Sequence, residues 1–243
     1  MTKQTPDRQK HKDAPWRNFY GRRHGKKLRQ HQADLLNTRL IELAPPGVDW
    51  DENPERNHID LRSAYPDARE FWLEIGFGGG EHAIAQAAGN PDVQIIGAEP
   101  YINGVAKLLA AIERAGVSNL AVTDADARDV MDVLPDGSIA QTFLLYPDPW
   151  PKTRHHKRRF MNPAQLDMLA RVMAPGARLR VATDIEDYVR HSLQVIDQDP
   201  RFTWAAERPV DWRMPWPGWH RTRYEAKALR EGRTPHYLTF VRQ

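Results

Sequence analysis

The 243-residue sequence contains no cysteine. This absence excludes disulfides, thiol nucleophiles and thiolate metal sites, and it agrees with a reducing compartment. Long apolar runs are also missing, since no stretch approaches the roughly 20 residues that a membrane-spanning helix needs. Ten histidines are present, but no pair has a recognised ligand spacing, so we expect no metal site and no membrane partner. A polar, basic N-terminus without an apolar signal core favours a cytoplasmic location.

The formal net charge is only +3, but the charges are unevenly distributed. Residues 1–30 contain ten lysines and arginines against two acids, Asp7 and Asp13. A second basic block, residues 152–159, has five cations in eight positions. A charged run is usually solvated surface. Two such blocks in one chain nevertheless favour a polyanionic partner.

Hydrophobic patterning predicts three parts: a basic N-terminal arm and short helix at 1–45, a connecting loop at 46–69 and a larger domain at 70–243. Short buried strands are expected at residues 71–75, 93–99, 120–123, 139–146 and 179–183. Helices with apolar residues at i, i+3, i+4 and i+7 separate several of these strands. The alternation predicts an α/β fold with a doubly wound, mainly parallel sheet. Residues 236–241 alternate like a last strand, which we expect at an antiparallel edge.

The first predicted strand runs into the string Glu74-Ile75-Gly76-Phe77-Gly78-Gly79-Gly80. Glycines at a strand-to-helix turn let the backbone approach a ligand closely. A dinucleotide fingerprint needs its third glycine at position 81, where this sequence has Glu81. A carboxylate there would repel a pyrophosphate, so the turn favours a nucleotide-like cofactor without phosphates. A plain tight turn is the structural alternative.

Acids follow the other predicted strands, at the edge of the sheet where ligands bind. Glu99 ends the second strand 23 residues after Gly76, about where a carboxylate that accepts from two ribose hydroxyls is expected. Asp126 follows the third strand and is assigned to an adenine amine, with Asp124 as a competitor. Asp184 ends the fifth strand.

The segment after the fourth strand is Tyr146-Pro147-Asp148-Pro149-Trp150. A proline on each side restricts the backbone around Asp148, which suits a carboxylate that must be pre-positioned. The second basic block begins two residues after Trp150. Trp150 itself has two interpretations, stacking on a base or packing under the loop.

This segment carries a family resemblance. The string Pro147-Asp148-Pro149-Trp150-x-Lys152-x-Arg154-His155-x-Lys157-Arg158-Arg159 resembles the hallmark of the bacterial tRNA (guanine-N7-)-methyltransferases. The turn after the first strand is similar to the first motif of the class I S-adenosylmethionine-dependent methyltransferases. The resemblance extends to Gly21-Arg22-Arg23-x-Gly25, Ala182-Thr183-Asp184 and Thr222-x-Tyr224-Glu225, and it covers roughly residues 20–243.

The resemblance implies a Rossmann-like fold, the cofactor S-adenosyl-L-methionine, and a tRNA partner methylated at guanine N7 in its variable loop. The cofactor contacts that it implies are Glu74, Gly76, Gly78, Glu99, Asp126 and Asp148. The tRNA contacts that it implies are Lys152, Asp184, Thr222, Arg223, Tyr224 and Glu225.

The chemistry of guanine gives Asp148 its expected catalytic role. Guanine N7 has a lone pair and no proton, so its attack on a methyl group needs no general base. The ring becomes cationic as it is methylated, and a nearby carboxylate stabilises that charge. Asp148 or Asp184 can also accept hydrogen bonds from guanine N1–H and the 2-amino group. We therefore assign Asp148 to orientation and electrostatics.

The second basic block is expected to bind phosphates. Lys152 would lie nearest the reacting base, with Arg154, Lys157, Arg158 and Arg159 on the RNA backbone. Two alternatives stay open: a methyltransferase for another RNA base or an exocyclic amine, and a non-catalytic RNA-binding protein on the same fold. The cations after Trp150 disfavour the exocyclic-amine alternative, and the complete set of acids disfavours the non-catalytic one. The chain is expected to be a monomer or a homodimer.

Overall fold

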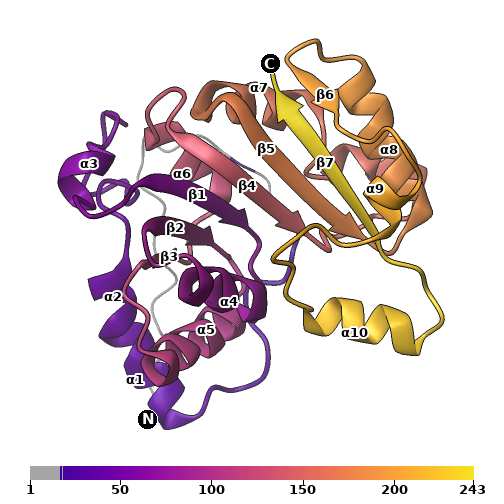
Figure 1. Ribbon diagram of the computed structural model, residues 1–243. Helices are drawn as coiled ribbons and strands as arrows, with labels where there is room; N and C mark the ends of the chain where they lie inside the picture. Colours follow the sequence, from indigo (N-terminus) through magenta and orange to yellow (C-terminus); the bar gives the residue numbers. More distant parts are fainter. Residues whose placement is uncertain (1–16, 18) are drawn as a thin grey trace.

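The computed structural model describes Arg17 and residues 19–243. Five strands pair in parallel in the order β3-β2-β1-β4-β5 (Figure 1). Their bounds are β1 Glu70–Ile75, β2 Val93–Ala98, β3 Leu120–Thr123, β4 Ile139–Leu145 and β5 Met173–Thr183. Strand order reverses beside β1, so the sheet is doubly wound and the predicted fold class is confirmed.

The C-terminal strand lies inside the sheet. β7 (His236–Arg242) pairs antiparallel with β5, and β6 (Phe202–Trp204) pairs antiparallel with β7 on its other side. The expectation that this last strand forms the edge is therefore wrong. β6 escaped prediction because three residues are too few to show an alternating pattern.

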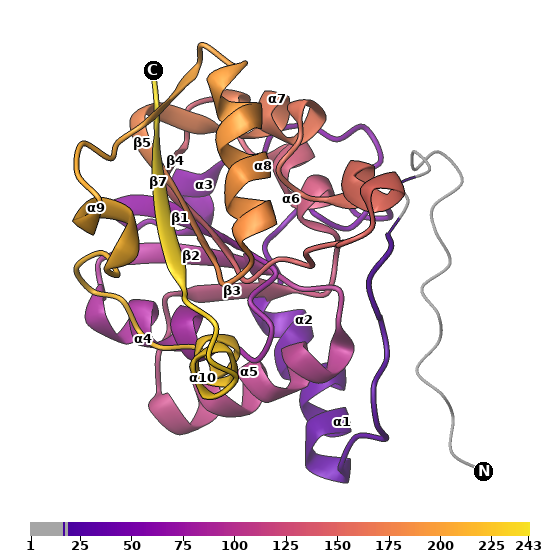
Figure 2. The same ribbon diagram turned by 90° about the vertical axis from the view of Figure 1, so that its right-hand side faces the viewer.

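Helices cover both faces of the sheet (Figure 2). One face carries α1 (Gln30–Asn37), α2 (Arg39–Leu43), α4 (Glu81–Gly89) and α5 (Ile102–Ala115). The other carries α6 (Ala127–Val133), α7 (Pro163–Val172) and α8 (Glu186–Asp197). Shorter helices are α3 (Leu61–Ala64), η1 (Thr153–Arg158), α9 (Val210–Arg213) and α10 (Arg223–Arg230).

Helix α5 shows how the sequence pattern fixes this packing. Its apolar residues recur at helical spacing, and those that the pattern marked are buried: Val105, Leu108, Leu109 and Ile112. Gly116 caps the helix with φ +65, a left-handed conformation that glycine adopts without penalty. The N-terminus of α5 follows the carboxyl end of β2, so the packing places the β2–α5 connection at the ligand-binding edge.

The short helix predicted within residues 1–45 is split at Thr38 into α1 and α2. Leu35, Leu36 and Leu40 of these helices join the core formed by α4 and α5. Much of the predicted basic arm falls on residues 1–16 and 18, which lie outside the described residues. Within the described part of the chain, no helix is long and apolar enough to cross a membrane.

Candidate active site

The carboxyl ends of β1, β2 and β4 surround a cavity of about 510 Å³, a size typical of small-molecule sites. Its wall also includes the N-terminal segment 19–22, the start of α6, residues 157–160 and one side chain of α10. The predicted site residues that line it are Gly76, Gly78, Glu99, Asp126, Asp148 and Tyr224. One cavity therefore brings together five of the six predicted cofactor residues and one predicted tRNA residue.

The turn after β1 depends on glycine conformations. Gly76, Gly78 and Gly80 have φ values of +70, +58 and +78, in the region that other residues rarely adopt. Gly104 of α5 packs against the same turn, since a Cβ at Gly104 would lie 2.1 Å from the Gly78 carbonyl oxygen. The helix thus approaches the turn at backbone distance and fixes its shape.

Glu99 joins this turn to the end of β2. Its Oε2 accepts a hydrogen bond from the Gly78 N–H at 2.7 Å, and its Oε1 accepts one from the Tyr101 N–H at 2.8 Å. Burial raises the pKa of Glu99 and the charges of Asp148 and Glu74 add to the rise, while the two N–H donors oppose it. Each oxygen keeps a further lone pair, so the carboxylate can accept from a ligand's hydroxyls while it holds the turn.

Glu74 is not among the described residues that line the cavity. Its side chain is 2% exposed, and its Oε2 lies 2.8 Å from Nδ1 of the equally buried His82. This contact joins β1 to α4 across the turn, which agrees with the predicted role in holding the loop. The predicted contact of Glu74 with the cofactor stays a prediction.

Asp126 caps the N-terminus of α6 and lines the cavity. It accepts from the backbone N–H of Arg128 at 2.9 Å and pairs with the guanidinium of the same residue at 2.9 and 2.7 Å. Burial acts to raise the pKa of Asp126, but the hydrogen bonds from Arg128 hold it below its ordinary value. Asp124 is not among the described residues of the cavity wall, so the geometry favours Asp126.

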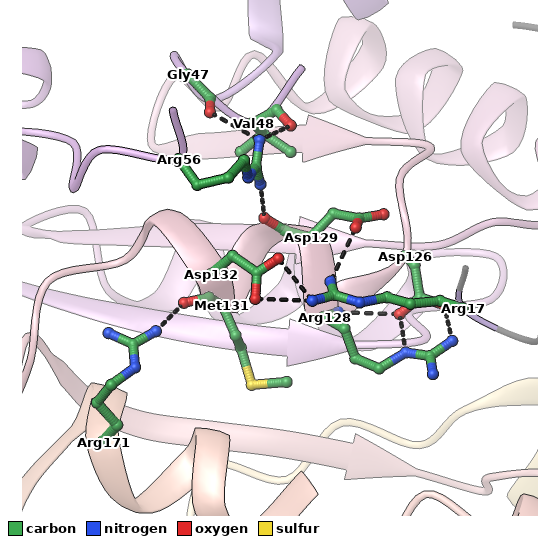
Figure 3. Close-up of polar contacts among 10 residues, drawn as sticks. All are labelled: Arg17, Gly47, Val48, Arg56, Asp126, Arg128, Asp129, Met131, Asp132 and Arg171. Carbon is green, nitrogen blue, oxygen red and sulfur yellow. Dashed lines mark hydrogen bonds and ion pairs between the residues drawn. The ribbon is translucent and has the colours of Figure 1, made fainter. Parts of the chain in front are cut away.

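Helix α6 is fixed by arginines from three other segments (Figure 3). Arg17 pairs with Asp129 at 2.9 Å and with Asp132 at 2.7 Å. Arg56 donates to the backbone carbonyl of Asp129, and Arg171 donates to that of Met131. The contact of Arg17 also anchors the N-terminal segment two residues before it reaches the cavity at Phe19.

The loop after β4 has an unusual backbone at both ends. Tyr146 has φ +51 and Trp150 has φ +44, values that cost about 1–3 kcal/mol each in non-glycine residues. Such conformations persist only where the surroundings hold them. The Tyr146 N–H donates to the carbonyl of Ala182 in β5 at 2.7 Å, which fixes one end of the loop.

Arg159 fixes the other end of this loop. It is 1% exposed, donates from Nε to the carbonyl of Pro149 at 2.9 Å and pairs with Asp187 at the start of α8. The prediction that Arg159 binds RNA phosphates is wrong for this reason. A run of cations in a sequence does not show which one points inward.

Asp148 lies between these fixed ends and is exposed in the cavity. Burial by the surrounding wall raises its pKa, and no cation or donor among the described residues offsets that rise. An ionised carboxylate in such a place is available to a ligand's hydrogen-bond donors and to positive charge.

Charges of opposite sign occupy different parts of the wall. Acids gather at the strand ends: Glu99, Asp126 and Asp148. Cations come from the N-terminal segment and from residues 157–159, and Arg158 lies over the rings of Tyr20 and Trp150 at 4.4 and 5.0 Å. Trp150 is half-buried, contacts Arg158 and Tyr20 and also lines the cavity, so stacking on a base and packing under the loop both stay predictions. Within the part of the chain that the structure describes, no group of three or more His, Asp or Glu is placed to hold a metal ion.

Two predicted tRNA residues of α10 are buried and occupied by protein contacts. Thr222 caps the helix by accepting from the Glu225 N–H at 3.2 Å. Glu225 is 3% exposed and accepts from Trp219 Nε1–H and from the Tyr237 hydroxyl, both at 2.7 Å. Thr222 thus caps α10, Glu225 attaches the helix to β7 through Tyr237, and the contact of both residues with tRNA stays a prediction.

Arg223 and Tyr224 bring α10 onto the glycine turn. Arg223 pairs with Glu81, which occupies the first turn of α4. A pyrophosphate would need that helix N-terminus, so Glu81 and its partner agree with a cofactor that has no phosphates. Lys152 is exposed at the start of η1, and Asp184 pairs with Arg233. The tRNA contacts of Lys152, Asp184 and Arg223 also stay predictions.

Sequence reasoning gave no role to several cavity residues: Phe19, Tyr20, Arg128 and Tyr146. The first two come from a segment distant in sequence, and no local pattern indicates where that segment docks. Tyr146 carried a usable signal, because an aromatic residue directly precedes the proline-bounded acid.

The strand order, the glycine turn and the acids at the strand ends define a class I methyltransferase architecture. Among solved structures, the 16S rRNA methyltransferase KamB aligns with a TM-score of 0.54 at 17% identity, over 77% of this chain and 95% of its own. TrmN from Thermus thermophilus aligns with a TM-score of 0.50 at 15% identity, over 75% of this chain and 47% of its own. At such identities the similarity shows the fold alone.

Sequence comparison gives the particular family. Residues 68–238 match the family model described as "Putative methyltransferase". A tRNA (guanine-N(7)-)-methyltransferase of Roseobacter denitrificans is 60% identical over 100% of both chains. One from Brucella melitensis is 50% identical over 93% of this chain and 95% of its own. This chain belongs to the tRNA (guanine-N(7)-)-methyltransferase family, as the motif after the fourth strand predicted.

The role of Arg159 in holding the loop predicts an effect on stability. Arg159→Leu removes the donor to Pro149 and leaves Asp187 without its buried partner. We expect the free energy of unfolding to fall by about 2 kcal/mol, measured by urea denaturation. Arg190→Leu is the matched control, because Arg190 makes an exposed 3.5 Å ion pair with the same Asp187. Arg190→Leu should lower the free energy of unfolding by at most about 1 kcal/mol. Equal decreases for the two variants would contradict the role of Arg159 in holding the loop.

Proposed function

We propose that this chain transfers a methyl group from S-adenosyl-L-methionine to N7 of a guanosine in tRNA. The observation that carries the proposal is Asp148, a carboxylate held on a fixed loop and open to the cavity that also contains Glu99 and the glycine turn. Membership of the tRNA (guanine-N(7)-)-methyltransferase family supports the reaction and the substrate.

The residues present fit this cofactor. Glu99 offers both carboxylate oxygens to the ribose hydroxyls, and Asp126 faces the cavity where an adenine amine would need an acceptor. The turn at Gly76 and Gly78 exposes backbone to the same space. The cofactor supplies an electrophilic methyl group on a sulfonium, and a cavity wall rich in acids suits its positive charge.

Asp148 acts on the acceptor base in this proposal. Its carboxylate accepts hydrogen bonds from the N1–H and 2-amino group of guanine, and it stabilises the positive charge that the ring gains at N7. A base without those donors would leave the acid desolvated and unpaired, which disfavours it. Orientation of N7 toward the methyl group lowers the barrier further, since well-placed reactants can save roughly 7–11 kcal/mol of activation free energy. No proton has to leave N7, so no general base is required.

The exposed cations of the second basic block and of the N-terminal part hold the RNA phosphates. In this proposal, residues 1–45 assist RNA binding and residues 70–243 contain the reaction site. Residues 46–69 connect these two parts. The target guanosine lies in the variable loop, and the enzyme works in the bacterial cytoplasm as a monomer or a homodimer. The charge pattern of the sequence supports the phosphate contacts and the role of the N-terminal part, and the family resemblance supports the variable-loop target.

Analysis of the product tests the proposed function. The full chain is incubated with unmodified tRNA transcripts and S-adenosyl-L-methionine labelled on its methyl group, and the RNA is digested to nucleosides. We expect the label in 7-methylguanosine. Label in another nucleoside would leave a methyltransferase with a different acceptor, and cofactor binding without transfer to any tRNA would favour a non-catalytic RNA-binding protein.

The raised pKa of Asp148 predicts an acid limb in the pH profile. A carboxyl group with a raised pKa takes up its proton at a higher pH than a free aspartic acid does, and the neutral form no longer stabilises the cationic ring. At saturating cofactor, the rate should therefore fall as pH falls through a midpoint above about 3.9.

Asp148→Asn should lower kcat on the order of 100-fold and remove this limb. The matched control is Asp67→Asn, because Asp67 is exposed and precedes β1 at the opposite edge of the sheet. Near-normal turnover by Asp148→Asn would overturn the role of Asp148.

A further inference from the structure

We propose that Tyr146 and Tyr224 form the two walls of a slot that receives the acceptor guanine by stacking. This inference rests on the proposed function and adds a base-binding site to it. The two residues come from opposite sides of the cavity, the end of β4 and the first turn of α10, and both line its wall. Asp148 follows Tyr146 by two positions and lines the same cavity.

The two rings form a nearly parallel, stacked pair. The rings of Tyr146 and Tyr224 lie within 21° of parallel, with their centroids 6.3 Å apart. Aromatic carbons in contact lie about 3.5–4.0 Å apart, so a base inserted between two rings needs about 7 Å. The observed centroid separation lies within the range of about 4.5–7 Å of stacked aromatic pairs, so the two rings pack against each other. A planar base enters only if the Tyr224 ring moves away from the Tyr146 ring.

Tyr146 is the fixed wall. Its backbone has φ +51, which the following proline does not favour, and the hydrogen bond from its N–H to the carbonyl of Ala182 holds it there. Strain of this kind is retained at functional sites where it aims a side chain. The Tyr146 hydroxyl is buried and has no hydrogen-bond partner among the described residues, so internal hydrogen bonding does not explain the position of the ring.

Tyr224 is the more exposed wall. It is 46% exposed although it lies in the cavity, and its ring rests on the glycine turn, where a Cβ at Gly78 would come within 3.0 Å of it. Helix α10 is attached to the domain at its first turn, by Arg223 to Glu81 and by Glu225 to Trp219. It lies beyond the carboxyl ends of β4 and β5 (Figure 1), where RNA would approach the cavity.

A target base that leaves the RNA stack loses its neighbours, and aromatic faces in the enzyme replace them. Stacking is tolerant of base identity because every base has a flat face. Asp148 then selects guanine, because its carboxylate accepts hydrogen bonds from N1–H and the 2-amino group at the edge of the same base. The slot thus binds the base, and the acid selects it.

The test compares ring removal with hydroxyl removal. Single-turnover methylation of unmodified tRNA is measured at saturating tRNA and cofactor for Tyr146→Leu, Tyr146→Phe, Tyr224→Leu and Tyr224→Phe. Loss of one stacking face should slow the leucine variants about tenfold or more, and the phenylalanine variants should restore most of the rate. Trp204→Leu removes an exposed ring from β6, outside the cavity wall, and serves as the control.

Calorimetric titration with S-adenosyl-L-methionine and thermal melting separate this role from general damage. We expect the cofactor Kd and the melting temperature of Tyr146→Leu to stay close to those of the wild type. Equal rates for the leucine variants and the wild type would overturn the slot, as would a rate loss that follows the cofactor Kd. A wild-type chain without activity on tRNA would instead contradict the proposed function.

Discussion

The carboxylate of Glu99 makes the interaction on which the cavity depends. Its two oxygens accept from the backbone of Gly78 and Tyr101, which belong to two different strand-to-helix connections. This bridge and the close packing of Gly104 together join the glycine turn after β1 to the start of α5. The turn must be fixed because Gly104 packs against it at backbone distance and Tyr224 rests on it from the other side. The residue that would hold a ribose thus also builds the wall.

A second constraint acts on the acceptor side. The loop around Asp148 is strained at Tyr146 and Trp150, and it is fixed by Ala182 at one end and by the buried Arg159 at the other. Strain held in this way costs stability and yields a carboxylate that is already in place. The two constraints meet in one cavity, where acids lie at the strand ends and cations lie along the segments that lead outward.

The sequence allowed prediction of the parallel sheet, because each of its five strands contains a short apolar run followed within three positions by a glycine or an acid. The first half of β5 was missed, since Pro175, Gly176 and Arg178 interrupt its apolar pattern. It also allowed the prediction that Glu99, Asp126 and Asp148 lie at the same edge of the sheet, because the carboxyl ends of parallel strands meet there.

The sequence did not allow prediction of contacts between segments that are distant along the chain. Arg17 anchors the N-terminal segment to α6 by contacting residues more than one hundred positions away in the sequence. No local sequence pattern indicates such a contact.

The direction of individual side chains was equally hidden. Arg159 and Glu225 both look like surface residues in the sequence, yet each is a buried hydrogen-bonding centre. Burial of a charged residue depends on which partner the tertiary fold supplies. The interior position of β7 was missed for a related reason, since β6, the strand that pairs with its outer side, is only three residues long.

The central claim is that the cavity presents guanine N7 as the nucleophile. The most direct measurement is methyl transfer to a tRNA transcript in which 7-deazaguanosine replaces guanosine. The analogue keeps the flat ring, N1–H and the 2-amino group, and it lacks only the atom that would be methylated. The account predicts binding with an unchanged Kd and no methyl transfer. Transfer to the 7-deaza transcript at the rate seen with guanosine would contradict it.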